Sequence, residues 1–154
     1  MPRTLLLGYG NTLCGDDALG PMAVERLRAL LPGAEFISCH QLGPELAETM
    51  AVFDFALFLD AACDGEPGTV HVERLSPSSD QAASLTHHVE PAALLELAHA
   101  LYGRAPLAML VTGVGESFDN HEGLSAKGNQ ALEEICRIVP RIVPKPLADL
   151  PTME

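Results

Sequence analysis

Basic residues are scarce in this sequence. Its 154 residues include 9 Lys and Arg against 21 Asp and Glu, so the formal net charge is −12. No cluster of Lys and Arg could neutralise a run of phosphates, which argues against nucleic acid as a partner. A surface this acidic suits basic peptide segments or cations, although it also serves solubility alone.

Long apolar runs are missing as well. No stretch approaches the ~18 uninterrupted apolar residues that a membrane span needs, and the apolar run before Gly8 is too short for the core of a signal peptide. We therefore expect a soluble, cytoplasmic protein that does not bind a membrane. A hydrophobic content of 47% in a chain of this length predicts one globular domain.

The cysteines form no recognisable motif. Cys14, Cys39, Cys63 and Cys136 are widely spaced, without the C-x-x-C pair of a zinc ribbon or redox site, and are expected to be free thiols. The chain also lacks H-E-x-x-H, G-x-S-x-G and G-x-x-x-x-G-K-[ST]. No common hydrolase or nucleotide-binding motif therefore supports a conventional nucleophile or a phosphate site.

The chain does contain a series of short apolar runs bounded by turn residues. Such runs predict strands that are buried on both faces, as in a parallel sheet. They cover residues 4–7, 36–38, 55–59 and 108–111. A fifth segment, Thr69 to Leu75, alternates apolar and polar residues and is therefore expected to lie at the edge of the sheet.

Helical patterns occupy the stretches between these runs. Apolar residues three and four apart predict four helices, which follow the start signals Pro21, Pro44, Pro91 and Ser125. Alternating strands and helices predict an α/β three-layer sandwich with a mostly parallel five-stranded central sheet and one antiparallel edge strand. The domain is expected to span residues 1–139, followed by an irregular Pro-rich tail over residues 140–154.

The loop after the first strand is rich in glycine. It reads GYGNTLCGDDALG from Gly8 to Gly20. A dinucleotide-binding loop would need Gly or Ala at Leu13, and two carboxylates before the helix would repel a pyrophosphate. Asp16 and Asp17 therefore either cap the following helix, which is the commoner role of such a pair, or take part in a site.

Other candidate site residues also follow predicted strands, where α/β folds gather their ligands. Asp60 ends the apolar run 55–59; it either meets a cation or hydrogen-bond donor there or simply begins a turn. His40 follows the second strand, and His87 and His88 precede the third helix; each could bind a metal or be an ordinary loop residue. Carboxylate and imidazole ligands suit Ni, Zn, Mn or Fe, and the ligand types alone do not choose among them.

These motifs together resemble those of the [NiFe]-hydrogenase maturation endopeptidases. The family pattern G-x-G-N-x-L-x-x-D-[DE]-x-x-G is matched at every position from Gly8 to Gly20. The family's apolar strand that ends in Asp is matched at residues 57–61, and its T-H loop at Thr86-His87. Residues 113–118 and 123–125 resemble its later G-V-x-x-E-S-F and G-L-S segments. The similarity extends from Leu5 to about Val139.

The resemblance implies that Asp17, Asp60 and His87 contact nickel, with His88 as the alternative to His87. The nickel would belong to the partner, the large-subunit precursor of a [NiFe] hydrogenase, and the peptidase would have no resident organic cofactor. It would remove the C-terminal extension of the precursor after nickel insertion, as an aspartyl endopeptidase-like enzyme and a monomer. Asp17 or Asp60 could act as the catalytic base, or the metal could acidify a water molecule.

Two other functions remain open at this stage. One is a non-catalytic, nickel-dependent assembly factor that holds the precursor without cutting it. The other is a small-molecule hydrolase or a nucleotide-binding enzyme on a similar α/β sandwich. The carboxylate-rich first loop argues against the second alternative, because it would repel phosphate ligands.

Overall fold

A five-stranded sheet forms the centre of the molecule, and the computed structural model describes residues 2–78 and 89–144. The strands lie in the order β2-β1-β3-β5-β4. In chain order, the elements are β1 Thr4–Tyr9, a 3-10 helix Gly15–Ala18, α1 Leu19–Leu30, β2 Glu35–Cys39, α2 Leu46–Met50, β3 Phe55–Ala62, β4 Val70–Leu75, α3 Pro91–Tyr102, β5 Leu107–Val114 and α4 Ala126–Ile142.

Strand direction agrees with the expectation from the sequence. β1 pairs in parallel with β2 and β3, and β3 pairs in parallel with β5. β4 pairs antiparallel with β5 at the end of the sheet. β1 and β3 are the most continuously buried strands, in keeping with their place in the middle of the sheet and their cover on both faces. The predicted α/β sandwich with one antiparallel edge strand is confirmed.

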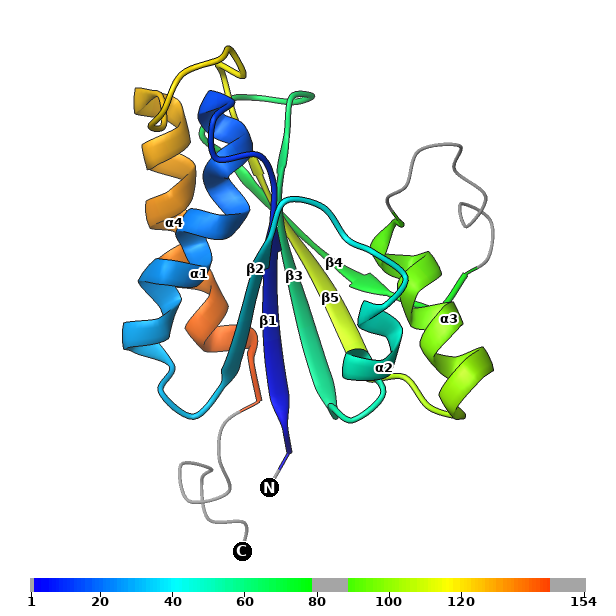
Figure 1. The fold of residues 1–154 in the computed structure, drawn as a ribbon. Helices are drawn as coiled ribbons and strands as arrows, with labels where there is room; N and C mark the ends of the chain where they lie inside the picture. Colours follow the sequence, from blue (N-terminus) through cyan, green and yellow to red (C-terminus); the bar gives the residue numbers. More distant parts are fainter. Residues whose placement is uncertain (1, 79–88, 145–154) are drawn as a thin grey trace, which may run out of the picture.

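Helices cover both faces of the sheet (Figure 1). On one face, α1 and α4 pack on side chains such as Leu6, Leu57 and Val111. On the other, α2 and α3 pack on the alternate side chains of the same strands, such as Leu7, Ala56 and Phe58. The alternation along each strand therefore builds two hydrophobic cores from one apolar run.

The first helix begins earlier than the sequence predicted. Pro21 was expected to open it, but α1 begins at Leu19, directly after the 3-10 turn Gly15–Ala18. Pro21 is tolerated there because a first-turn N–H needs no partner within the helix. Gly20 also favours this start: a Cβ at that position would overlap the carbonyl oxygens of Leu59 and Tyr9, so only glycine lets α1 lie this close to the sheet.

The other helix boundaries follow their capping signals. Pro91 opens α3, and Gly103 ends it with a left-handed φ of 80°. Ser125 caps α4, its side chain accepting a hydrogen bond from the backbone N–H of Gly128. α4 runs through Pro140 to Ile142, so the first residues of the expected tail are helical.

All four cysteines are free thiols, as expected. Among the described residues, no helix combines the length and the apolar character required to cross a membrane.

Candidate active site

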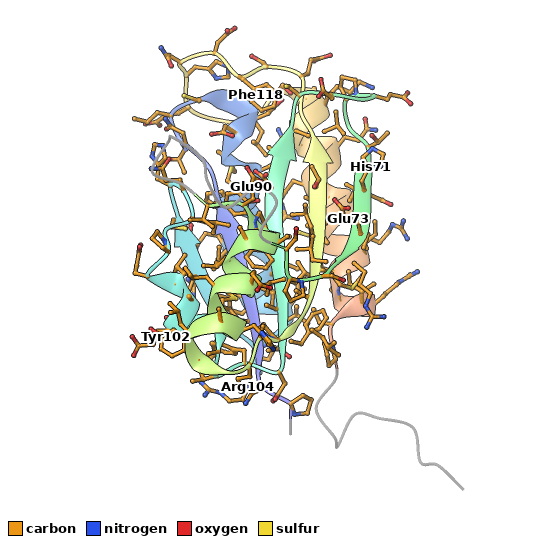
Figure 2. All side chains as sticks on the ribbon, turned by 90° about the vertical axis from the view of Figure 1, so that its right-hand side faces the viewer. His71, Glu73, Glu90, Tyr102, Arg104 and Phe118 are labelled. Carbon is orange, nitrogen blue, oxygen red and sulfur yellow. The ribbon has the colours of Figure 1, made fainter. Side chains whose placement is uncertain are left out.

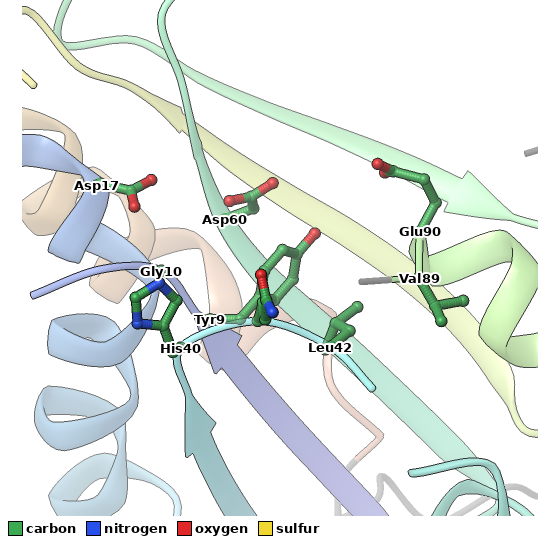
Figure 3. A pocket seen from close by; sticks show the side chains of 9 residues that line it. Tyr9, Gly10, Asp17, His40, Leu42, Asp60, Val89 and Glu90 are labelled. Atoms are coloured by element: carbon green, nitrogen blue, oxygen red, sulfur yellow. The ribbon is translucent and has the colours of Figure 1, made fainter. Parts of the chain in front are cut away.

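A cavity of about 350 Å³ opens at the carboxyl ends of β1, β2 and β3. The strand order places these three ends side by side, because β2 and β3 flank β1 in the sheet. The lining residues come from the ends of β1 and β3, from the segments that follow β1 and β2, and from the residues just before α3: Tyr9, Gly10, Asp17, His40, Gln41, Leu42, Asp60, Val89 and Glu90. Asp17 and Asp60, about 40 residues apart in the chain, face the same space (Figure 3).

The glycine-rich loop holds Asp17 at the rim of this cavity. One carboxylate oxygen of Asp17 accepts a hydrogen bond of 2.7 Å from the backbone N–H of Asn11. The Asn11 side chain accepts from the N–H of Leu13 at 2.9 Å, which closes the turn. Gly10 has a φ of 151°, and a Cβ there would overlap the carbonyl oxygen of Asp17. The loop can therefore fold back on itself only with glycine at this position.

Asp60 lies near the end of β3, half-buried beside Tyr9. Burial raises the pKa of Asp60 from 3.8 to about 6, and the charges of Asp17 and Glu90 act in the same direction. The backbone N–H of Ala61 and the Tyr9 hydroxyl donate hydrogen bonds to the carboxylate and oppose the shift. Burial and the same carboxylate raise the pKa of Tyr9 well above its usual range, so its hydroxyl stays a donor.

The raised pKa of Asp60 predicts that this carboxylate destabilises the folded protein. The folded protein keeps a proton that the unfolded chain loses between pH 3.8 and about 6, so stability falls across this window and stays lower above it. Asp60→Asn should therefore raise the free energy of unfolding by about 2 kcal/mol at about pH 8 and leave it unchanged at about pH 4. Urea unfolding at both pH values measures this.

The matched control is Asp64→Asn, which changes an exposed aspartate outside the cavity. It should leave the free energy of unfolding unchanged at both pH values. An Asp60→Asn variant that is no more stable than the wild type at about pH 8 would contradict the conclusion that burial of the Asp60 carboxylate destabilises the folded protein.

Asp16 has a different role from its neighbour Asp17. It is completely buried, and its carboxylate accepts hydrogen bonds from the backbone N–H groups of Glu116, Ser117 and Ser125 at 2.7, 3.0 and 2.8 Å. The Ser125 hydroxyl donates a fourth bond of 2.6 Å. Burial alone would raise the pKa of Asp16, but these four bonds together hold it below its ordinary value.

The hypothesis that Asp16 and Asp17 cap the first helix is wrong. No side chain caps either the 3-10 turn or α1. Asp16 instead ties the glycine-rich loop to the loop after β5 and to the N-cap of α4, and Gly128 leaves the space that its carboxylate occupies. This network fixes the loop from which Asp17 reaches the cavity.

Of the three candidate histidines, His40, His87 and His88, only His40 lies among the described residues. His40 lines the cavity, as expected for a residue that follows a strand of a parallel sheet. His87 and His88 lie outside the described residues. Over residues 2–78 and 89–144, no three His, Cys, Asp or Glu side chains are grouped closely enough to hold a metal ion.

The cavity carries uncompensated negative charge. Asp17, Asp60 and Glu90 line it, no Lys or Arg does, and none of the three takes part in an ion pair within the described part of the chain. Carboxylates in such a position attract a cation, or one of them can accept a proton from water. The arrangement therefore suits metal or cation binding and general-base chemistry, and disfavours phosphate groups.

Tyr9 and Glu90 are members of the site that the sequence did not single out. Tyr9 occupies a variable position of the glycine-rich motif, and Glu90 precedes the Pro91 helix start. The only sequence signal was their place at the end of a strand or just before a helix, next to other polar residues. Many residues that have no role in a site share such a position.

Known proteins of this architecture include proteases. The chain is 33% identical over 147 residues to the hydrogenase 2 maturation protease of Escherichia coli K12, covering 86% of this chain and 88% of that protein. The solved structure of the hydrogenase maturating endopeptidase HybD from E. coli superposes with a TM-score of 0.70 at 30% identity, over 89% of each chain.

A more distant structure shares the fold. The [NiFe] hydrogenase maturation protease HycI from Thermococcus kodakarensis superposes with a TM-score of 0.72 at 23% identity, over 92% of each chain. No protein-family model matches this sequence.

Proposed function

Because this chain belongs to the family of hydrogenase maturation proteases, and is thus a hydrolase, we propose that it removes the C-terminal extension of the large-subunit precursor of a [NiFe] hydrogenase. The observation that supports this most directly is the pairing of Asp17 with Asp60 in one cavity that no Lys or Arg of the described residues lines. Such a pair suits recognition of a divalent metal ion that the precursor brings.

Asp17, Asp60 and His87 are the proposed nickel contacts. Asp17 and Asp60 supply carboxylate oxygens, and His87 supplies an imidazole nitrogen. Val89 lies in the cavity wall, and His87 stands two positions before it in the sequence. His88 is the alternative ligand, and His40 is a further imidazole at the rim.

Nickel acts in this proposal as part of the substrate. Three protein ligands leave coordination positions for the precursor's own groups, so the enzyme binds the nickel-loaded precursor more tightly than the empty one. Cleavage then reports that nickel insertion is complete. The enzyme needs no organic cofactor of its own, and it is proposed to act in the cytoplasm as a monomer.

In the proposed mechanism, the carboxylates of Asp17 and Asp60 carry out the proton transfers. The half-buried Asp60, with a pKa of about 6, is partly protonated near neutral pH, whereas Asp17 lies at the loop rim beside the Asn11 N–H. A carboxylate poised in this way can accept a proton from the attacking water. The Tyr9 hydroxyl holds Asp60 in place by donating to it. Nickel, when bound, would acidify a nearby water molecule.

Incubation of the purified protein with the large-subunit precursor tests this function. We expect the intact mass of the precursor to fall by that of its extension when nickel is loaded, and to remain unchanged without nickel. The expected difference in rate is about 100-fold or more, because the metal supplies the main contact between the two proteins. A control precursor that lacks the extension should keep its mass.

Two outcomes would contradict the proposal in different ways. Nickel-dependent binding without a mass change would indicate an assembly factor in place of a protease. Equal cleavage of nickel-free and nickel-loaded precursor would leave the protease activity but remove the role of nickel.

A further inference from the structure

A second cavity adjoins the active site and shares one of its walls. It has a volume of about 280 Å³ and lies between the start of α3 and the edge of the sheet. Its lining comprises Glu73, Leu75, Ser78, Glu90, Pro91, Ala92 and Leu110. Glu90 lines both cavities, so the two adjoin each other, and the second is also lined by Glu73 and Leu75 of β4. Figure 2 shows Glu90 and Glu73 on the same face of the molecule.

The chemistry of this second cavity suits an extended peptide. Leu75, Leu110 and Pro91 supply apolar surface. Glu73 and Glu90 supply two exposed carboxylates. Among the described residues, neither forms an ion pair and no basic side chain lines the cavity. Apolar surface bordered by unpaired negative charge is complementary to a peptide that carries Lys or Arg among apolar residues.

We propose that this second cavity binds the C-terminal extension of the precursor while the bond beside it is cut, and that Glu73 and Glu90 select an extension that carries a Lys or Arg. The inference rests on the proposed function. The main body of the precursor is folded and presents the nickel to Asp17 and Asp60. The extension is the flank with a free end, so it can pass Glu90 into the second cavity, which is lined in part by the edge strand β4.

The test is a double-mutant cycle between the enzyme and its substrate. Glu73→Gln should raise KM about fivefold with kcat unchanged, because the contact is made equally in the bound substrate and in the transition state. A precursor in which every Lys and Arg of the extension is changed to Gln should show a similar rise with the wild-type enzyme. Combining both changes should add nothing further.

Controls separate this effect from others. Glu48→Gln changes an exposed glutamate of α2 that lines neither cavity, and its KM should equal that of the wild type. The KM difference caused by Glu73→Gln should shrink at high ionic strength, which a loss of folding would not produce. Glu90→Gln serves as the second variant and should also raise KM; its kcat is not compared with that of the wild type, because Glu90 also lines the active-site cavity.

Several results would overturn the inference. These are an unchanged KM for both Glu73→Gln and Glu90→Gln, additive effects of the enzyme and substrate changes, and an extension without any Lys or Arg. A wild-type enzyme that does not cut the nickel-loaded precursor would instead refute the proposed function, so the two failures can be told apart.

Discussion

Asp17→Asn and Asp60→Asn should each slow cleavage of the nickel-loaded precursor by about 100-fold or more. Replacing groups that only support a metal ligand commonly costs about 10–100-fold, and these changes neutralise the ligands themselves. The two carboxylates meet in one cavity although they come from different elements, the 3-10 helix and β3, so the loss should be similar for either residue. Single-turnover assays with intact-mass detection measure the rate.

The loss of cleavage can be separated from a loss of folding. Asp60→Asn is expected to be more stable than the wild type above about pH 6, so a well-folded and inactive variant would point directly to the carboxylate. Asp64→Asn, outside the cavity, should cleave at the wild-type rate. Near-normal cleavage by both Asp17→Asn and Asp60→Asn would remove these residues from the mechanism.

Asp16→Ala should lower the free energy of unfolding by about 3 kcal/mol or more. The change leaves the backbone N–H groups of Glu116, Ser117 and Ser125 without their acceptor, and each such buried donor costs about 1–3 kcal/mol, not all of it additive. Urea unfolding at neutral pH measures the loss, which is large against the ~5–15 kcal/mol of a typical domain.

The contribution of Asp16 should also depend on pH. Because its folded-state pKa is lowered, the stabilisation is complete above the ordinary pKa of an aspartate and is lost as the pH falls through the lower folded-state value. The difference between wild type and Asp16→Ala should therefore shrink in acid. Asp119→Ala, an exposed residue of the same loop region, should cost less than about 0.5 kcal/mol. A cost for Asp16→Ala as small as this would show that the network is dispensable.

Asp16 and Asp17 show what a local sequence motif can predict and what it cannot. Both stand in the same motif and looked equally able to cap a helix. The structure buries Asp16 in a network with residues about 100 positions away and leaves Asp17 at the rim of the cavity. Apart from the family resemblance, which pointed to Asp17, nothing in the local sequence separates the two, because the partners of Asp16 lie far along the chain.

The strands were predictable because strand type depends on a local pattern. Continuous apolar runs marked β1 and β3 as inner strands, and the alternation in β4 marked it as an edge. The start of α1 was less predictable, since the helix begins before Pro21, where Gly20 lies against the carbonyl oxygens of Leu59 and Tyr9. A contact with another element decided that boundary.

The sequence alone determined the α/β class, the parallel inner strands and the carboxylates that follow them, because apolar periodicity and turn residues act over a few positions. The family resemblance supplied the expectation of nickel and of a hydrogenase precursor. Only the tertiary structure decided that Asp17 and Asp60 share a cavity with Tyr9 and Glu90. The reason is physical: strand order in a sheet is set by how whole layers pack, and it brings together side chains that no local pattern relates.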